Sequence, residues 1–451
     1  MSSDWHGLAL GALGEFRNGV NFSREQEGHG LPVLKVKDFA SSYFVPSEGL
    51  DELDSRAIRV PDSQMLAPGD VVVIRSNGNP SLVGRCLYVA KLQRPTTFSG
   101  FCIRFRPNPE RVNPRFASYL LRAPASRARF YSFGSGTGIQ NLSQSVLSEL
   151  PVLLPPRTYQ DSITDLLAGL DDKIDLNRRM NRTLEAMAQA LFRSWFVDFD
   201  PVRAKAEGRQ PEGMDAETAA LFPSRLVDSE LGEIPEAWQI ASLGGLLDEI
   251  ETGSRPKGGV AGIVEGVPSV GAESVTRIGE YDYSKEKRVP RAFFEGMRKG
   301  KLRSWDVLLY KDGGRPGEFE PKASLVGEGF PFEEMAINEH VYRLRADHHL
   351  TQSFLYLLLS SETVKEELRR RGTGVAVPGL NSTALRTMPV LRPTGPVLRA
   401  FDSTASVLLR KILVTSKESR HLATVRDLLL PKLLSGEIRV GDAEVQLAAS
   451  A

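Results

Sequence analysis

The chain has 451 residues, with 57 Lys and Arg against 56 Asp and Glu, so its formal net charge is +1. Hydrophobic residues make up 41% and charged residues 25%. These values exclude a disordered chain, a collagen-like repeat and a disulfide-rich scaffold. The even balance argues against a uniformly polycationic nucleic-acid protein but leaves a local basic surface open. At about 100–200 residues per domain, the length predicts two to four domains.

The cysteine content and the N-terminus indicate the compartment. Cys86 and Cys102 are the only two cysteines, which is typical of a reducing environment. The first ten residues lack the basic and apolar regions of a signal peptide. No apolar run reaches the roughly 18 residues needed to span a bilayer. We therefore expect a cytoplasmic protein.

The sequence is internally duplicated. The matching stretches are WHGLALGALGEFRNG from Trp5 with WQIASLGGLLDEIETG from Trp238, LPVLKV at 31–36 with VPSVGA at 267–272, Asp70 with Asp306, GTG at 136–138 with GTG at 372–374, and LPVLLPP from Pro151 with MPVLRPT near Pro389. Three of these matches share an offset of 236 residues, and the last has an offset of 238. Matches in the same order at a nearly constant offset indicate two copies of one domain, because such a long period does not suit a solenoid.

Each copy has the pattern of a mixed α and β domain. Short β-branched and aromatic runs predict strands at 33–39, 70–76, 84–90 and 101–107, and at 306–312, 323–329 and 340–346 in the second copy. Helical patterns follow at 114–123 and 351–371. Because the strands follow one another without helices between them, we expect a mostly antiparallel sheet and the α+β class.

A heptad pattern follows each copy. In the first, the repeat positions are Ile163, Leu167, Leu170, Ile174, Asn177, Asn181, Leu184, Ala188, Leu191 and Trp195. In the second, they are Phe401, Ala405, Leu408, Ile412, Thr415, Ser419, Leu422, Arg426, Leu429 and Leu433. Both seams have apolar ends and a polar middle, and polar seam residues restrict register and partner choice. We expect the two helices to form an antiparallel coiled coil, since this relates the duplicated halves by a two-fold axis.

The segment between the first helix and the second copy differs in composition. Residues 200–236 contain four prolines and nine acidic against four basic residues, which predicts a solvated linker. We accordingly divide the chain into a first domain (1–157), a central helix (158–199), this linker (200–236), a second domain (237–394) and a C-terminal helix (395–451).

Catalytic and metal-binding patterns are weak. The sequence contains no phosphate-binding G-x-x-x-x-G-K-[ST], no H-E-x-x-H, no G-x-S-x-G and no paired C-x-x-C. The histidines lack metal-ligand spacing, and His348 with His349 is interpreted as a surface pair. Asp306, Glu320 and Lys322 follow the acidic-acidic-lysine order of many metal-dependent nucleases, but the first copy has no counterpart for the last two. We predict no catalytic or metal site in this chain.

Basic residues are unevenly distributed. Residues 1–155 carry 17 basic against 13 acidic residues, and 285–303 carry eight against two. A solvated loop would explain the second run, and phosphate contact is the functional alternative. Arg suits guanine, and Asn or Gln suits adenine, in a base-reading loop. The predicted DNA-binding residues are Lys35, Lys37, Arg75, Ser76, Asn77, Asn79, Gln140, Asn141, Arg255, Lys257, Lys285, Lys287, Arg288, Arg291, Lys311 and Arg315.

Taken together, these features resemble the specificity (S) subunit of type I restriction-modification enzymes. The most specific part is LPVLLPPRTYQDSITDLLAGLDDKIDLNRRMNRTLEAMAQALFRSWFVDFDPVRAKAEGR at 150–209, and LGEIPEAW before the second copy is also typical. The resemblance implies two target recognition domains, each reading one half of a split, asymmetric double-stranded DNA target. It also implies that the paired helices set the spacing and dock two modification (methyltransferase) subunits.

The resemblance places the chemistry in partner subunits. It implies S-adenosylmethionine on the modification subunit, and ATP and Mg²⁺ on the restriction (translocase and nuclease) subunits, with no cofactor in this chain. Two alternatives remain: a stand-alone nuclease or methyltransferase, and a coiled-coil scaffold that does not bind DNA. Arg426 stands where the first helix has Ala188, and either snorkelling or contact with another subunit would explain it.

Overall fold

The structure is a computed structural model that describes residues 5–39, 43–132, 141–313, 319–372 and 378–450. The chain forms two compact units, residues 1–175 with 421–451 and residues 176–420, which are described separately below. Among the described residues, no helix combines the length and apolar character required to cross a membrane.

The first unit is built on two small sheets. The larger, antiparallel sheet has the order β2 (Gly14–Asn18), β8 (Cys102–Pro107), β5 (Val71–Ile74) and β6 (Cys86–Tyr88). The smaller has the order β4 (Asp51–Asp54), β3 (Gly30–Leu34) and β7 (Thr97–Phe98), with β3 and β7 parallel. Strand β1 (His6–Ala9) pairs with β9 (Pro151–Leu154). All four residues of β5 are buried, as expected for an unbroken β-branched run in the middle of a core.

Short helices cover the larger sheet of the first unit. They are α1 (Pro114–Arg122), α2 (Pro124–Ser132) and α3 (Gln144–Ser148). Helix α1 begins at Pro114 because Asn113 caps it, accepting hydrogen bonds from the backbone N–H groups of Arg115 and Phe116. Its apolar face, with Phe116 fully buried, packs into the same hydrophobic cluster as the larger sheet.

The second unit repeats this arrangement element by element. Its larger sheet has the order β13 (Leu247–Thr252), β19 (Val341–Ala346), β16 (Val307–Tyr310) and β17 (Ala323–Leu325). Its smaller sheet has the order β15 (Arg288–Val289), β14 (Val267–Val270) and β18 (Ala336–Ile337), again with one parallel pair. Strand β12 (Gln239–Ser242) pairs with β20 (Pro389–Arg392), and the helices are α7 (Arg291–Gly296), α8 (Gln352–Ser360), α9 (Glu362–Arg371) and α10 (Ser382–Arg386). The predicted duplicated α+β domains are therefore confirmed.

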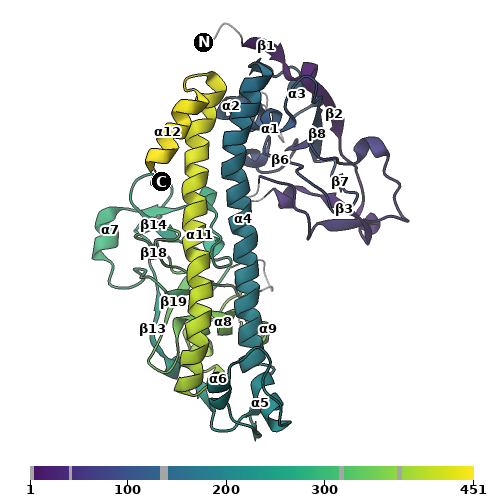
Figure 1. Cartoon of the computed structure of the whole chain (residues 1–451). Coiled ribbons are helices and arrows are strands. Elements are labelled where there is room, and N and C mark those ends of the chain that lie inside the picture. The colour runs from purple at the N-terminus through teal and green to yellow at the C-terminus, as the bar shows by residue number, and fades with distance from the viewer. Residues whose placement is uncertain (1–4, 40–42, 133–140, 314–318, 373–377, 451) are drawn as a thin grey trace. The chain divides into compact units, whose positions relative to one another are not determined.

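Two long helices follow the two sets of strands (Figure 1). They are α4 (Arg157–Phe196) and α11 (Gly395–Ser435), and α12 (Val440–Ser450) follows α11. Within the second unit, the Asn177 side chain donates to Ser419 Oγ (3.1 Å) and that of Asn181 donates to Ser416 Oγ (2.9 Å). Numbers rise along α4 as they fall along α11, so the helices run antiparallel, as predicted.

Residues 200–236 do not form a solvated linker, and that expectation is wrong. They fold into α5 (Asp200–Ala206), α6 (Ala216–Ala220) and the hairpin of β10 (Leu226–Ser229) with β11 (Gly232–Pro235). Val202 and Phe222 are buried in the main hydrophobic cluster of the second unit, and the Phe222 ring lies edge-on to Trp195 at 5.0 Å. Burial of these apolar side chains orders the segment despite its many acidic residues. Since the two compact units also cut across both long helices, the five-part division of the chain stays a prediction.

Candidate nucleic-acid interface

A buried ion pair supports the central strand of the first unit. Asp70, next to β5, has a side chain only 1% exposed, and Arg106 of β8 binds it through two nitrogens at 2.7 and 2.8 Å. The backbone N–H of Ala67 donates to the same carboxylate at 2.7 Å. A bidentate arginine with an added backbone donor satisfies a buried carboxylate well. This arrangement fixes one end of β5, and the predicted DNA-binding residues lie at the other end.

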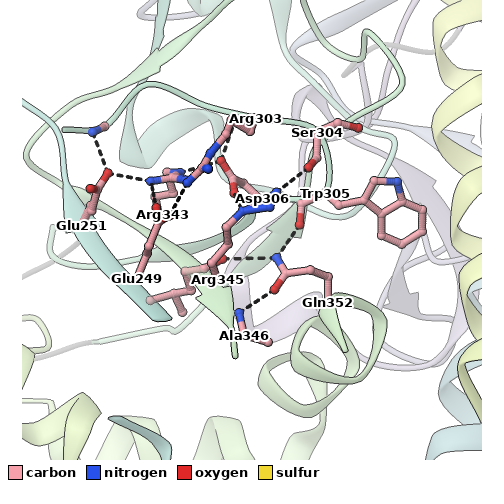
Figure 2. A network of polar contacts seen from close by, with 12 residues as sticks. Glu249, Glu251, Arg303, Ser304, Trp305, Asp306, Arg343, Arg345, Ala346 and Gln352 are labelled. Atoms are coloured by element: carbon pink, nitrogen blue, oxygen red, sulfur yellow. Dashed lines mark hydrogen bonds and ion pairs between the residues drawn. The ribbon is translucent and has the colours of Figure 1, made fainter. Parts of the chain in front are cut away.

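The second unit has a larger version of the same network (Figure 2). Asp306, next to β16, accepts hydrogen bonds from Arg343 Nε (2.6 Å) and from the backbone N–H of Arg303 (2.7 Å). Arg343, itself buried, also reaches Glu251 at 2.6 Å and Glu249 at 2.5 Å. Burial raises the pKa of Asp306 while Arg343 opposes this shift, and a hydrogen bond from Arg303 holds the pKa of Glu249 below its usual range.

These contacts separate the acidic residues of the nuclease-like sequence order. Asp306 is fully buried inside the network, whereas Glu320 forms a two-point pair with Arg369, at 2.9 Å for both bonds. The two carboxylates therefore hold different arginines and do not converge on a shared metal position. Asp347, His348 and His349 do bring their ligand atoms within 4.8 Å of one another, but Arg392 Nη2 lies 3.1 Å from His349 Nδ1. A fixed cation at that distance disfavours a metal ion.

At the other end of β5, several predicted DNA-binding residues lie together. The N–H of Leu142 donates to the Arg75 carbonyl at 2.8 Å, and Arg75 Nε donates to the Asn141 side chain at 3.1 Å. Ser76 forms an isolated β-bridge with Asn141. The N–H of Arg75 donates to the Phe101 carbonyl at 2.9 Å, and the Phe101 ring is 59% exposed. The guanidinium of Arg75, the amide of Asn141 and the aromatic ring of Phe101 thus lie together at this end of β5.

The second unit has the same backbone contacts at the end of β16. The N–H of Leu380 donates to the Lys311 carbonyl at 2.8 Å, Asp312 forms a bridge with Gly379, and the N–H of Lys311 donates to the His340 carbonyl at 3.0 Å. Lys311 corresponds to Arg75, Asp312 to Ser76 and His340 to Phe101. We call the residues 75, 76, 101 and 141 the first tip, and the residues 311, 312, 340 and 379 the second tip.

Other predicted DNA-binding residues have local structural roles or lie outside the described residues. Asn79 caps a short 3-10 helix by accepting from the Ser81 N–H at 3.0 Å, and Asn77 accepts from the Asn79 N–H at 2.8 Å. Gln140 and Arg315 fall outside the described part of the chain.

Most of the predicted phosphate-contacting cations are paired with acids of their own unit. Lys35 lies 2.9 Å from Asp51, which Lys37 also contacts, and Arg291 lies 2.7 Å from Glu334. The remaining pairs are Arg255 with Glu339, Lys285 with Asp282, Lys287 with Glu273 and Arg288 with Glu286. Lys257 is exposed, and no acidic residue in the described part of the chain forms an ion pair with it. The basic run at 285–303 is therefore largely neutralised by neighbours in space.

The predicted seam residues all lie on the covered side of their helices. Buried positions are Ile163, Leu167, Ile174, Asn177, Ile412, Thr415 and Leu429, and half-buried positions are Leu170, Asn181, Leu184, Leu191, Leu408, Ser419 and Leu422. In the polar middle, Asn177 also donates to Glu418 (3.0 Å), and Thr415 Oγ1 donates to Asn181 Oδ1 (2.5 Å). The amide nitrogens of both seam asparagines thus donate to the opposite helix.

The sequence did not identify the charged anchors beside the seam. In the first unit, Asp171 accepts from Tyr119 (2.9 Å), Arg122 (3.2 Å) and Arg426 (2.6 Å). Neither predicted explanation of Arg426 is therefore needed, because its partner is Asp171 of this chain and neither solvent nor another subunit. In the second unit, Glu185 binds Arg277 at 2.6 Å and accepts from the Tyr356 hydroxyl at 3.1 Å. Each buried carboxylate of α4 lies outside the heptad positions, so the seam pattern gave no signal for it.

The comparisons with known proteins agree with this architecture. Residues 3–186 match the family described as "Type I restriction modification DNA specificity domain". The type I restriction enzyme HindI specificity subunit of Haemophilus influenzae is 27% identical, with 97% of this chain and 100% of that protein covered. The MjaIX specificity subunit of Methanocaldococcus jannaschii is 24% identical, over 97% and 94% of the two chains.

A solved structure shares the fold. The S subunit of a type I restriction-modification system from M. genitalium matches with a TM-score of 0.52 and 14% identity, over 96% of this chain and 97% of that one. The match extends over nearly the whole of both chains, so the fold of this chain is shared with that structure. Over nearly its whole length the chain is similar to specificity subunits of type I restriction-modification enzymes.

Proposed function

We propose that this chain is the DNA-reading component of a type I restriction-modification complex, with one half of a split, asymmetric target read by each domain. One observation carries the proposal: the two domains keep the same framework and differ at its tips. Asp70 with Arg106 in the first unit corresponds to Asp306 with Arg343 and Arg345 in the second. The tips carry half-buried Arg75 and Ser76 with exposed Asn141 in one case, and half-buried Lys311 and Asp312 in the other. A shared scaffold with different polar edges suits two domains that read different bases.

The long helices supply the spacing in this proposal. Helix α4 has 40 residues and α11 has 41, so each is about 60 Å long at 1.5 Å per residue. One turn of B-DNA is about 34–36 Å, so helices of this length can hold two reading domains one turn apart. The base pairs between the half-sites would then remain unread.

Modification subunits are the proposed partners of the outer helix faces. Val407, Val414 and Leu428 of α11 are exposed and separated by multiples of seven residues, which places them on one face of the helix. Leu176 and Met187 are exposed on α4. Exposed apolar side chains in register along a helix are typical of a protein interface. S-adenosylmethionine, ATP and Mg²⁺ would be bound by the modification and restriction subunits, and this chain would act without catalysis in the cytoplasm.

The salt dependence of DNA binding tests the proposal. We expect the chain, assembled with its modification subunits, to lose about a thousandfold in affinity for its target between 50 and 200 mM salt, because several phosphates are neutralised. Fluorescence anisotropy with labelled duplexes measures this. Lys257→Ala should reduce the slope of log affinity against log salt by about one. Arg209→Ala, an exposed arginine paired with Glu207, is the matched control and should leave the slope unchanged.

The same assay separates the alternatives. A scaffold would show no steep loss of affinity with salt and no preferred sequence. A stand-alone enzyme would cleave or methylate DNA without other subunits when given Mg²⁺ or a methyl donor. Either result would contradict the proposed function.

A charge placed on the exposed face of α11 tests the docking proposal. Val414→Glu is expected to weaken binding of the modification subunit at least about tenfold, because the new carboxylate would be desolvated at the interface. Size-exclusion chromatography with light scattering would show the loss of the complex. Val264→Glu, the same substitution at an exposed valine outside the helices, is the control and should assemble normally. Normal assembly of both variants would move the docking surface elsewhere.

A further inference from the structure

The duplication lets one domain serve as a reference for the other. The backbone contacts at the two strand ends correspond. The carbonyl groups of Arg75 and Lys311 each accept a hydrogen bond from a leucine N–H. Their own N–H groups donate to the carbonyl group of the residue that precedes a strand, Phe101 in the first domain and His340 in the second. Phe101 and His340 therefore occupy the same place in the two domains. The backbone contacts around these two residues are the same in both domains. The domains differ in the side chain that each offers to a ligand, a phenyl ring in the first and an imidazole in the second.

The imidazole of His340 is held in place by a carboxylate. Its Nδ1 is hydrogen-bonded to Asp312 Oδ1, and the backbone N–H of His340 donates to Asn338 Oδ1 at 2.9 Å. The ring is 37% exposed and its Nε2 lies 3.5 Å from Glu339 Oε1. The Nδ1 bond leaves Nε2 as the nitrogen able to contact another molecule.

The backbone opposite Asp312 is adapted to this carboxylate. A Cβ atom at Gly379 would come within 2.5 Å of the Asp312 Cβ and 2.7 Å of the Lys311 carbonyl oxygen. In the first domain the corresponding pair is Ser76 with Asn141, where the smaller residue lies opposite an amide. The larger residue of each bridged pair thus lies opposite the smaller one, Asn141 opposite Ser76 and Asp312 opposite Gly379. The glycine therefore provides the space that Asp312 needs in the second tip.

Charged side chains surround this histidine. Asp312 and Glu339 lie next to its ring, Lys311 lies 3.1 Å from Asp312, and Arg255 lies 2.9 Å from Glu339. Burial alone would raise the pKa of Asp312, but His340 and Lys311 more than offset it and hold that pKa below its usual range. Asp312 thus presents a carboxylate to the His340 ring.

We propose that His340, oriented by Asp312, is a specificity-determining residue of the second domain, donating a hydrogen bond from Nε2 to the acceptor edge of a guanine. This proposal rests on the proposed function. Guanine presents two acceptors, N7 and O6, in the major groove, and a cationic donor suits them. Phe101 makes no such bond and is limited to apolar contact, for instance with a thymine methyl group. The two tips therefore read by different chemistry.

The test replaces His340 with the residue of the other domain. In the chain assembled with its modification subunits, His340→Phe is expected to relax one guanine position of the second half-site and to leave the first half-site unchanged. Sequencing that detects methyladenine maps both half-sites in one experiment. The loss of discrimination at that position should be about tenfold or more, as for loss of a charged hydrogen bond.

A pH series separates recognition from a structural effect. Wild-type affinity for the target duplex should fall as the pH rises from 6 to 8, because the donating proton is lost. His340→Phe and the milder His340→Gln should lack this dependence. His348→Phe removes a histidine of the same unit that is 82% exposed and not part of the tip, and it should retain both the dependence and the target sequence.

Two results would overturn the proposal: an unchanged second half-site in His340→Phe, or a pH dependence that persists in both His340 variants. Assembly with the modification subunits confirms that a variant is folded. Failure of the proposed function would look different, since the wild-type chain itself would then direct methylation to no defined sequence.

Discussion

Replacing residues 237–394 with the corresponding segment of a relative is expected to change the second half of the DNA target completely and to leave the first half intact. The physical reason is the separation of the cores. The sheets of each unit, with their Asp70 or Asp306 networks, are complete without strands from the other unit. Mapping of methyladenine in a host that carries the chimera and the modification subunit provides the measurement. The reciprocal exchange of residues 1–157 is the control and should change only the first half.

The junction of this chimera must preserve the contacts of residues 200–236, because these residues pack into the core of the second unit. Trp238 packs against Phe196 at 5.7 Å between ring centroids and against Phe222 at 6.3 Å. The tryptophan should therefore be retained in the transplanted segment so that the second core is not opened. A chimera that changes both halves of the target would contradict the assignment of one half-site to each domain.

Asp171→Ala is expected to destabilise the first unit by about 3–5 kcal/mol, which corresponds to roughly two to four orders of magnitude in the unfolding equilibrium. The Asp171 side chain is 1% exposed, and its loss leaves Arg122 and Arg426, 17% and 12% exposed, without their buried counter-charge. Hydrogen exchange followed by mass spectrometry reads the two units separately. Exchange should rise in α1 and in the first half of α4, and a urea titration should show a lower midpoint.

The neighbouring residue is a matched control. Asp172 pairs with Arg115 at 2.7 Å, but its side chain is 59% exposed. Exposed pairs contribute about 0–1 kcal/mol, so Asp172→Ala should change the urea midpoint little. Equal effects of the two substitutions would show that the buried cluster of Asp171 does not stabilise the first unit.

The duplication and the helix seam were predictable because they depend on periodicity. The offset that relates Asp70 to Asp306 also relates the two strand ends, and the step of four and three residues placed Asn177 and Thr415 on the covered face of their helices. Such patterns are local or repeat along the chain, so a single sequence contains them.

The pairing of charges was not predictable in the same way. The basic run at 285–303 suggested free cations, yet Arg303 meets Glu249 and Arg291 meets Glu334, acids far away in sequence. Counting charges in a window omits such partners, which only the fold brings close. For the same reason, the sequence did not show that Asp171 is the partner of Arg426. It also did not show that His340 contacts Asp312, because these two residues lie at the ends of different strands.

The composition of the first unit has a consequence for biosynthesis. Its core combines Leu10 and Leu167 with Leu429, Leu433 and Ala443, so it includes residues that are synthesised after the whole of the second unit. The second unit, residues 176–420, needs no segment beyond itself. Domains usually complete folding in the order of their synthesis, but here the domain that is translated first is completed last. A nascent chain therefore exposes part of its first core until residues 421–443 have been synthesised, and a premature stop after residue 420 would damage the N-terminal domain although none of that domain's strands is missing.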